Sequence, residues 1–218
     1  MSTSRQPFLE HAAVAGERVS LRPVVSSDSS AIFPLIHRQG EVLKWLVWDG
    51  PDSVAELEEG YQVWNKANPD GDSYHWAICD LAGNRVVGTI SARFLGHPFV
   101  GDMGYWLAEE HWGRGFVTEA IRLLCFVCFQ HLETRSMTAE VFLGNDGSSK
   151  VLERNAFVRE ETTHGRLLQD GQRRQAHLHT LTSRGYRRAW GDYAPASMDI
   201  RKASDSGGDK QRADRNWS

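Results

Sequence analysis

The chain has 218 residues, and its 25 Lys and Arg against 28 Asp and Glu give a formal net charge of -3. A chain with this charge has no overall positive field of the kind that attracts nucleic acid. No apolar run approaches the roughly 18 residues of a membrane span. We therefore expect neither nucleic acid nor a membrane as a partner. Three cysteines, and a start without an apolar signal segment, favour a reducing, cytoplasmic location.

The two ends differ in composition from the middle. Residues 1–15 are small and polar with little periodicity, and residues 191–218 hold too few apolar side chains to offset the entropy cost of ordering. We expect a flexible N-terminal segment at 1–15, one folded domain at 16–190 and a flexible polar tail at 191–218.

The first half of the domain alternates strand-like and helix-like patterns. Apolar–polar alternation predicts strands, and an apolar residue every three or four positions predicts helices. In chain order the predicted elements are a strand at 17–24, a helix from Ser26 or Ser27 through Ile36, a helix from Asp52 or Ser53 toward Trp64, a turn at 68–72, a strand at 74–79, a turn at 82–84 and a strand at 85–94. The last two strands form a hairpin, because only a short turn joins them.

In the second half, strands and helices follow each other. The predicted elements are a strand at 99–107, a helix at 116–129, a strand at 137–143, a helix at about 148–155, and strands at 157–161 and 175–181. The helix at 116–129 is apolar on nearly all sides toward its end, which indicates burial between layers. Strands that first pair antiparallel and are then separated by helices predict a mixed α/β fold, with helices on both faces of the sheet.

Residues 102–120, DMGYWLAEEHWGRGFVTEA, predict an anion site. A strand-like run leads into a Gly-x-Gly turn that opens a helix. Gly113 and Gly115 have no Cβ, so a phosphate can approach the backbone amides at the positive end of the helix. The turn lacks the Gly-Lys-Ser/Thr ending of a P-loop and the strand context of a dinucleotide fingerprint. A phosphorylated cofactor held mostly by backbone is expected.

Several segments stand in an order typical of one family: VVGTI at 86–90, DMGYWL at 102–107, WGRGFVTEA at 112–120 and NDGSSKVLERNAF at 145–157. Through them the chain resembles the GNAT acetyltransferase superfamily, and within it the RimJ/RimL type of N-acetyltransferase, which KWLVWDGP at 44–51 also resembles. The resemblance covers roughly residues 16–185 and makes 16–190 the expected N-acetyltransferase domain. It implies a mostly antiparallel sheet of about six to seven strands that splays in the middle, acetyl-CoA as cosubstrate without a metal, and a primary amine as acceptor.

The same resemblance implies two backbone surfaces for the cofactor. The pyrophosphate is met by the turn and first helical residues Gly113, Arg114, Gly115, Phe116, Val117 and Thr118. The pantetheine arm pairs with the splayed strand at Trp106, Leu107 and Ala108, where a backbone amide can also stabilise an oxyanion. Alternatives remain at two positions, since Arg114 can be merely solvated and Thr118 can cap its own helix. Val117 stands where the family usually has Gly or Ala and narrows the approach to the backbone.

The resemblance also implies the catalytic pair. Ser148 matches a serine that donates a hydrogen bond to the departing CoA sulfur, and Asn145 matches a residue that contacts the pantetheine or nearby backbone. A free thiol has a pKa of roughly 8.5, so a leaving thiolate gains from a donor at neutral pH. The alternative is structural, with Asn145 as a helix cap and Ser148 as an ordinary first-turn residue.

A general base is harder to assign. Some members of this branch carry a catalytic Glu after the NAF segment, where the present chain offers His164 instead. Asp102, at the start of the splayed strand, and Glu58, in the second helix, are the other candidates, and a water relay is a further alternative. Asp102 is retained among the expected catalytic residues.

We therefore expect direct attack of an amine on acetyl-CoA in a ternary complex, by a monomer or homodimer. The acceptor is a protein N-terminal α-amine or a small amine such as a polyamine, amino acid or antibiotic. A non-catalytic acyl-CoA-binding regulatory module is the alternative from another class. Cys125 and Cys128 form a C-x-x-C pair inside an apolar helix with no second ligand pair, and are expected to pack in the core rather than bind metal.

Overall fold

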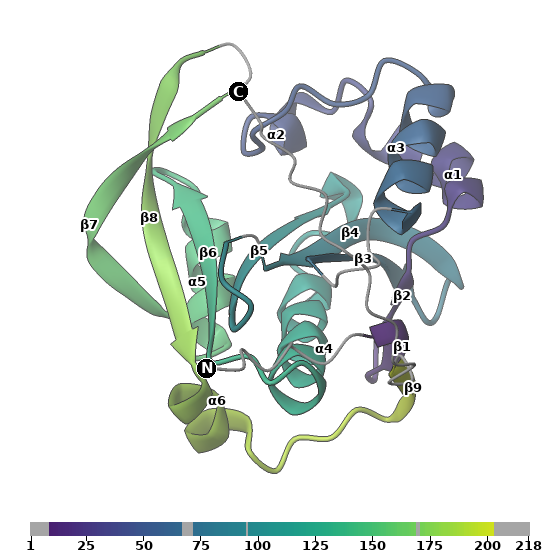
Figure 1. The fold of residues 1–218 in the computed structure, drawn as a ribbon. Helices are drawn as coiled ribbons and strands as arrows, with labels where there is room; N and C mark the ends of the chain where they lie inside the picture. Colours follow the sequence, from purple (N-terminus) through teal and green to yellow (C-terminus); the bar gives the residue numbers. More distant parts are fainter. Residues whose placement is uncertain (1–8, 67–71, 95, 169–170, 203–218) are drawn as a thin grey trace, which may run out of the picture.

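The computed structural model describes residues 9–66, 72–94, 96–168 and 171–202. One sheet contains nine strands in the order β7-β8-β6-β5-β4-β3-β2-β1-β9 (Figure 1). In chain order the strands are β1 (Leu9–Ala15), β2 (Val19–Pro23), β3 (Ser73–Asp80), β4 (Arg85–Arg93), β5 (Val100–Leu107), β6 (Ser136–Phe142), β7 (Val158–Leu167), β8 (Arg173–Thr182) and β9 (Ser197–Lys202). The pairs are antiparallel except for β5 and β6, which run parallel.

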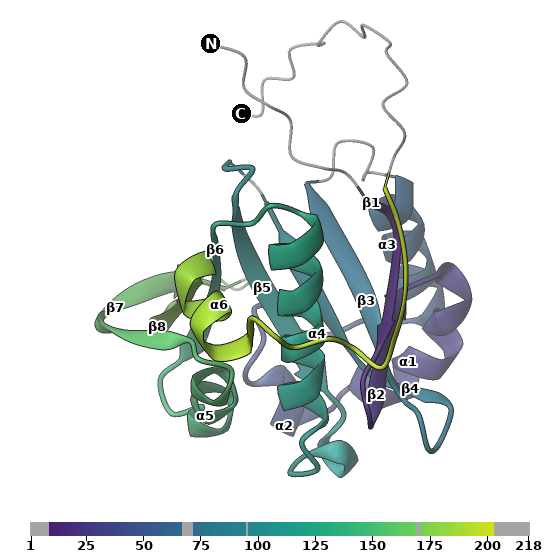
Figure 2. The same ribbon diagram turned by 90° about the horizontal axis from the view of Figure 1, so that it is seen from below.

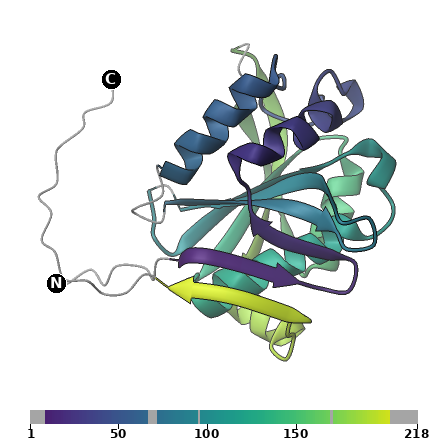
Figure 3. The same ribbon diagram turned by 90° about the vertical axis from the view of Figure 1, so that its right-hand side faces the viewer.

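Helices cover both faces of the sheet, as predicted. They are η1 (Ser26–Asp28), α1 (Ser29–Ile36), α2 (Gly40–Leu43), α3 (Val54–Lys66), η2 (Glu109–His111), α4 (Phe116–His131), α5 (Asp146–Arg154) and α6 (Ser183–Trp190). Figure 3 shows α1 and α3 on one face and α4 with α6 on the other, and Figure 2 shows α4 across the middle of the sheet. None of the described helices is long and apolar enough to cross a membrane.

Each face has its own apolar core. The larger core surrounds α4, whose residues from Ala120 to Cys128 are mostly fully buried, and the smaller lies under α1 and α3. Cys125 and Cys128 are free thiols inside the larger core, and burial raises the pKa of both. The prediction that this pair packs in the core is confirmed.

The sheet splays between β5 and β6, as the family resemblance implied. The two strands pair only at Val100–Ser136, Gly101–Met137 and Asp102–Thr138. Beyond these pairs β5 continues to Leu107 and β6 to Phe142 without a further described pairing. A gap lined by free strand edges therefore opens in the middle of the sheet.

The expectation of flexible ends is wrong for two segments. Residues 9–15 form β1 and residues 197–202 form β9, and the two strands pair antiparallel at the edge of the sheet. Leu9, Ala12 and Val14 of β1 are buried, whereas β9 is mostly exposed and is ordered chiefly by backbone pairing with β1. The composition of each end, considered separately, does not reveal that the two segments pair. With these two strands the sheet has nine strands rather than six or seven.

The predicted elements of the middle of the chain are confirmed with shifted ends, and the hairpin is β3–β4. The start of α3 is also confirmed, because Ser53 Oγ accepts the Glu56 N–H at 3.2 Å and the Glu56 carboxylate accepts the Asp52 N–H at 2.7 Å. Residues 68–71 of the predicted turn lie outside the described residues. The short helix α2 and the helix α6 were not predicted.

Candidate active site

The turn between β5 and α4 leaves the start of α4 open. Gly113 (φ 74°) and Gly115 (φ 79°) have left-handed conformations that favour glycine, and a Cβ on Gly113 would meet nothing within 4 Å. Gly115 is the N-cap of α4 and offers no side-chain cap, while the Thr118 hydroxyl makes no hydrogen bond within the described part of the chain. The first N–H groups of α4 therefore remain available to an anion at the positive end of the helix dipole.

Trp112 holds this turn against the strand before it. Its indole Nε1 donates a hydrogen bond to the Leu107 carbonyl at 2.8 Å, although 43% of the residue is exposed. The bond joins the glycine turn to the end of β5. The glycine turn and the free strand edge are consequently tied to each other.

Arg18 reaches the same turn from the connection between β1 and β2, and no sequence pattern marked it. Its Nη1 lies 2.9 Å from the position that a Cβ on Gly115 would occupy. Glu119 of α4 holds the connection in place, because its carboxylate accepts the backbone N–H groups of Glu17, Arg18 and Val19 at 2.6, 3.0 and 3.2 Å. Within the described residues Arg18 has no ion-pair partner. A cation beside the positive end of a helix is unfavourable unless an anion joins them.

The edge of β5 that faces the gap carries the backbone groups of alternate residues. The Ala108 N–H donates to the Val87 carbonyl of β4 at 2.9 Å, and Trp106 lies two residues earlier on the same antiparallel ladder. Because bonded and non-bonded pairs alternate along such a ladder, Trp106 and Ala108 direct their backbone groups to β4. Tyr105 and Leu107 direct theirs to the gap.

This alternation divides the three residues expected at the pantetheine arm. Only Leu107 presents its N–H to the gap, and its carbonyl already accepts the Trp112 indole. The backbone of Trp106 and Ala108 is committed to β4, so the free edge belongs to Tyr105 and Leu107. The sequence alone could not predict this division, because the register of β4 against β5 decides which backbone groups face the gap.

Asn145 and Ser148 come together at the start of α5. The Asn145 Oδ1 caps the helix by accepting the Ser148 N–H at 3.2 Å, which is the capping role considered from the sequence. The Ser148 Oγ lies 2.6 Å from the phenol oxygen of Tyr105. Burial raises the pKa of Tyr105 to about 12, against the opposing effect of the Ser148 hydrogen bond. The phenol is therefore protonated at neutral pH and can donate.

The base candidates lie in different surroundings. Asp102 stands where β5 and β6 separate, and its Oδ2 accepts a hydrogen bond from Arg93 Nη2 at 2.5 Å. Glu58 is exposed on α3 and does not line the cavity described below. The backbone of His164 pairs with Ala176, and its side chain is outside the description. Glu140 of β6, not considered from the sequence, lies two residues beyond the pairing partner of Asp102 and so shares its face of the sheet.

One cavity of ≈ 1100 Å³ unites these features. All predicted site residues other than Ala108 and Arg114 line it, namely Asp102, Trp106, Leu107, Gly113, Gly115, Phe116, Val117, Thr118, Asn145 and Ser148. Val117 also packs against the core around α4. Lys150 and Arg154 of α5 add two cations to the lining.

The part of the cavity under α2 and α3 is aromatic. Trp45, Trp48, Tyr61, Trp64 and His75 line this part, and the carboxylates of Glu41 and Glu140 also line the cavity. His75 stacks on Trp64 with ring centroids 4.1 Å apart, and burial, aided by the charge of Arg93, lowers the pKa of His75 to about 4. The imidazole is therefore neutral near pH 7.

Arg174 of β8 packs on two aromatic rings that line the cavity. Its guanidinium lies over the rings of Phe142 and Trp45, at 4.7 and 5.2 Å from the centroids, and donates to the Lys44 carbonyl. The hairpin of β7 and β8 is thereby joined to the segment that follows α2.

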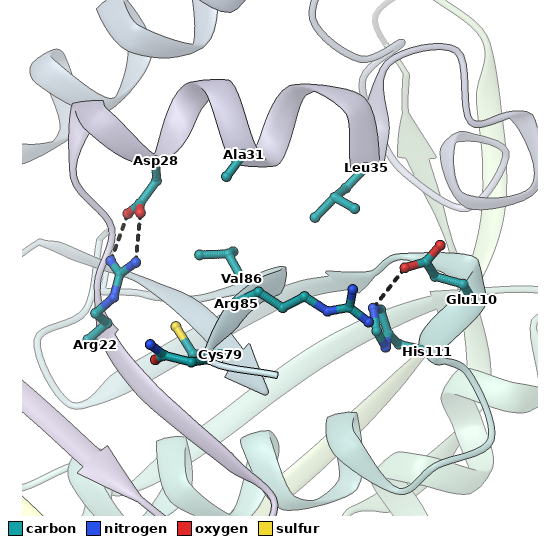
Figure 4. A pocket seen from close by; sticks show the side chains of 10 residues that line it. Arg22, Asp28, Ala31, Leu35, Cys79, Arg85, Val86, Glu110 and His111 are labelled. Atoms are coloured by element: carbon teal, nitrogen blue, oxygen red, sulfur yellow. Dashed lines mark hydrogen bonds and ion pairs between the residues drawn. The ribbon is translucent and has the colours of Figure 1, made fainter. Parts of the chain in front are cut away.

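A second cavity of ≈ 480 Å³ lies between α1, the β3–β4 hairpin and η2 (Figure 4). Arg22 and Asp28 form a two-bond ion pair on one side, at 2.8 and 2.7 Å, and Glu110 contacts His111 at 3.1 Å on the other. Burial raises the pKa of Cys79, which also lines it. None of the predicted site residues lines this cavity. Within the described residues no three His, Cys, Asp or Glu side chains converge as metal ligands.

The larger cavity and the glycine turn that lines it suit two parts of coenzyme A, the pyrophosphate and the pantetheine arm. Uncapped amides, two positive-φ glycines and Arg18 suit a pyrophosphate, while the free backbone groups of Tyr105 and Leu107 suit an amide-containing arm. A family model described as an acetyltransferase (GNAT) domain matches residues 18–158.

Known proteins resemble the chain in sequence and fold. An uncharacterized N-acetyltransferase of Bacillus subtilis, YoaA, is 24% identical over 156 residues, covering 71% of this chain and 88% of that protein. A ribosomal-protein-serine acetyltransferase of Escherichia coli is 34% identical over 59 residues, covering 27% and 33%. The solved structure of RimL, a ribosomal L7/L12 α-N-protein acetyltransferase in complex with coenzyme A, aligns with a TM-score of 0.69 at 20% identity and covers 78% of this chain and 97% of that one. At that identity the structure shows a shared fold.

Proposed function

The chain belongs to the GNAT acetyltransferase family and is an acetyl-CoA-dependent acyltransferase, and we propose that it acetylates a primary amine by direct attack in a ternary complex. One observation carries the proposal. The glycine turn, the free edge of β5 and Ser148 all line one cavity, whose lining also includes aromatic rings and carboxylates. Cofactor and acceptor would thus meet at β5.

In this proposal the start of α4 holds the pyrophosphate. The backbone amides of residues 113–118 donate to it, and Arg18 adds a charge-assisted contact across Gly115. The free backbone groups of Tyr105 and Leu107 pair with the pantetheine arm as a partial extra strand. Bound acetyl-CoA supplies an acyl group activated as a thioester.

Two groups of the chain then stabilise the charges that develop. An N–H of the β5 edge donates to the thioester oxygen, and the Ser148 hydroxyl donates to the sulfur as it leaves. Asn145 acts on this step through its cap, since it fixes the first turn of α5 and thus the place of Ser148.

Asp102 is the proposed proton acceptor. Arg93 occupies its Oδ2, and Oδ1 has no partner within the described residues. An N-terminal amine with a pKa of about 7.7–8.0 loses its proton to such a base more readily than a lysine with a pKa near 10.4. Glu140, on the same face of the sheet, is the alternative.

A protein N-terminal α-amine is the proposed acceptor. The names of the ribosomal-protein-serine acetyltransferase and of RimL support this class, as does the RimJ/RimL-like sequence pattern. Small amines remain the alternative within the class, because carboxylates and aromatic rings also suit polyamines. We further propose a cytoplasmic location, which the three free cysteines favour, and a monomer or homodimer.

The test is release of CoA thiol from acetyl-CoA with two acceptor panels. One contains decapeptides with free N-terminal Ser, Ala or Met and their N-acetylated controls, and the other contains spermidine, free amino acids and an aminoglycoside. Turnover with free but not blocked peptides supports the proposal, and turnover confined to the second panel selects the small-amine alternative. Binding of acetyl-CoA without turnover on either panel would identify a non-catalytic module.

A further inference from the structure

We propose that Tyr105 is a positioning residue that aims the Ser148 hydroxyl at the sulfur of bound CoA and so stabilises the departing thiolate. The inference rests on the proposed function, because it requires a CoA sulfur in the large cavity. It assigns Tyr105 a role in the transfer step and leaves Ser148 as the hydrogen-bond donor to the sulfur.

Two hydrogen bonds hold Ser148, one at its backbone and one at its side chain. Its backbone N–H donates to Asn145 at 3.2 Å, and its Oγ lies 2.6 Å from the Tyr105 hydroxyl, at the short end for a hydroxyl pair. Tyr105 comes from the free edge of β5 and Ser148 from the first turn of α5. The hydrogen bond therefore links the strand that binds the pantetheine arm to the helix that carries the donor.

The direction of this hydrogen bond follows from the choices open to each hydroxyl. Within the described residues, Tyr105 can otherwise donate only to the Ser148 carbonyl at 3.5 Å, which is too long for a good hydrogen bond. A phenol is also the better donor of the two hydroxyls, because it is the more acidic. When Tyr105 donates to Ser148 Oγ, the single Ser148 hydrogen stays free for the sulfur, and each bond in the chain strengthens the next.

The acyl transfer balances without a proton leaving either hydroxyl. The amine lone pair forms the N–C bond, the C–S bond breaks, and its electron pair goes to the sulfur. The proton lost by the nitrogen goes to the base or solvent. A thiol has a pKa of roughly 8.5, whereas burial raises the pKa of Tyr105 to about 12, so the phenol keeps its proton and the thiolate is stabilised by the Ser148 hydrogen bond.

The decisive measurement is the thiol pKa of bound CoA, followed by thiolate ultraviolet absorbance against a desulfo-CoA complex, which cancels the protein cysteines. We expect the thiol pKa of CoA bound to the wild-type protein to be lower than that of free CoA. Tyr105→Phe should raise it by about half a unit to one unit, since a hydrogen bond to a charged group is weakened. Ser148→Ala should raise it at least as far.

Tyr74→Phe is the matched control. Tyr74 is a buried tyrosine whose hydroxyl accepts the Leu9 N–H at 3.1 Å, away from the large cavity. The Tyr74→Phe variant should lose stability as Tyr105→Phe does, and the thiol pKa of bound CoA should stay unchanged. Equal thiol pKa values in wild type and Tyr105→Phe would overturn the proposal.

Turnover gives a second, independent readout. With the best acceptor of the two panels, Tyr105→Phe should lower kcat about threefold to tenfold and change the KM for acetyl-CoA less than about twofold. In a Ser148→Ala background it should have no further effect, because the two residues act as one unit. Additive losses would overturn the coupling.

The two proposals fail separately. Absence of turnover on any amine would sink the transferase proposal, while the thiol titration still decides the role of Tyr105. A chain that binds no CoA would overturn both.

Discussion

Arg18 and Gly115 lie in contact at the start of α4, where Arg18 Nη1 is 2.9 Å from the place of a Gly115 Cβ. The contact adds a side-chain cation from a distant segment to a turn whose other donors are mainly backbone amides. Two features therefore disfavour a larger residue at position 115, namely the φ of 79° and the guanidinium beside it.

Gly115→Ala should weaken CoA binding by roughly tenfold, because the added methyl displaces Arg18 and strains the turn. Gly171→Ala is the matched control, since Gly171 has a φ of 78° and nothing within 4 Å of an added Cβ. Both variants should lose about 1 kcal/mol of unfolding free energy. Calorimetric titration with CoA should show the affinity loss in Gly115→Ala alone, and unaltered affinity would remove the turn from the site.

Arg18→Gln should reduce CoA affinity by roughly fivefold to thirtyfold, as expected for loss of one charge-assisted contact. The loss should persist with dephospho-CoA, which keeps the pyrophosphate and lacks the 3′-phosphate. Arg85→Gln, at an exposed arginine that lines only the smaller cavity, should leave affinity unchanged. A loss seen with CoA but absent with dephospho-CoA would place Arg18 at the 3′-phosphate instead.

Asn145→Ala should cost about 1 kcal/mol of stability through the lost cap of α5 and should also lower kcat, since Ser148 is no longer fixed. Thr182→Ala removes an equivalent cap from α6, where the Thr182 Oγ1 accepts the Gly185 N–H at 3.1 Å. Chemical denaturation should show similar losses in both variants. If both also kept wild-type kcat, the cap would have no part in catalysis.

Asp102→Asn should lower kcat/KM by roughly 10²–10⁴-fold if Asp102 accepts the proton. Glu140→Gln, at the carboxylate on the same face of the sheet, should leave kcat/KM close to the wild-type value. The reverse pattern would transfer the role to Glu140. Because Asp102→Asn also unpairs Arg93, an Arg93→Gln variant measures the contribution of the ion pair by itself.

His75 should make the fold sensitive to acid. Its pKa is lowered to about 4 in the folded chain by burial and then by Arg93, against about 6.5 when unfolded. The unfolded chain therefore binds more protons between these values, and stability falls as pH drops from about 6.5 to 4, by roughly 2–3 kcal/mol. His75→Phe keeps an aromatic ring against Trp64 and should flatten this part of the stability–pH curve. An unchanged slope would show that other groups cause it.

Much of the fold could be predicted because its signals are local. Alternation identified β2 to β6, and the apolar helix at 116–129 proved to be the buried α4. The strands at the two ends could not be predicted from composition, because β9 has few buried side chains and depends on its pairing with β1. Backbone pairing has no signature in either segment alone.

By itself the sequence indicated the acetyltransferase family and the parts of the candidate site made by neighbouring residues: the glycine turn at 113–115, and the cap and hydroxyl of Asn145 and Ser148. Only the tertiary structure decided which groups complete them. Arg18 meets Gly115 because Glu119 binds the β1–β2 connection, and Tyr105 meets Ser148 because β5 separates from β6 beside α5. Strand register likewise turned the backbone of Tyr105 and Leu107, rather than Trp106 and Ala108, toward the gap. Contacts between distant segments depend on pairing and packing of the whole sheet, and no local pattern of residue types encodes them.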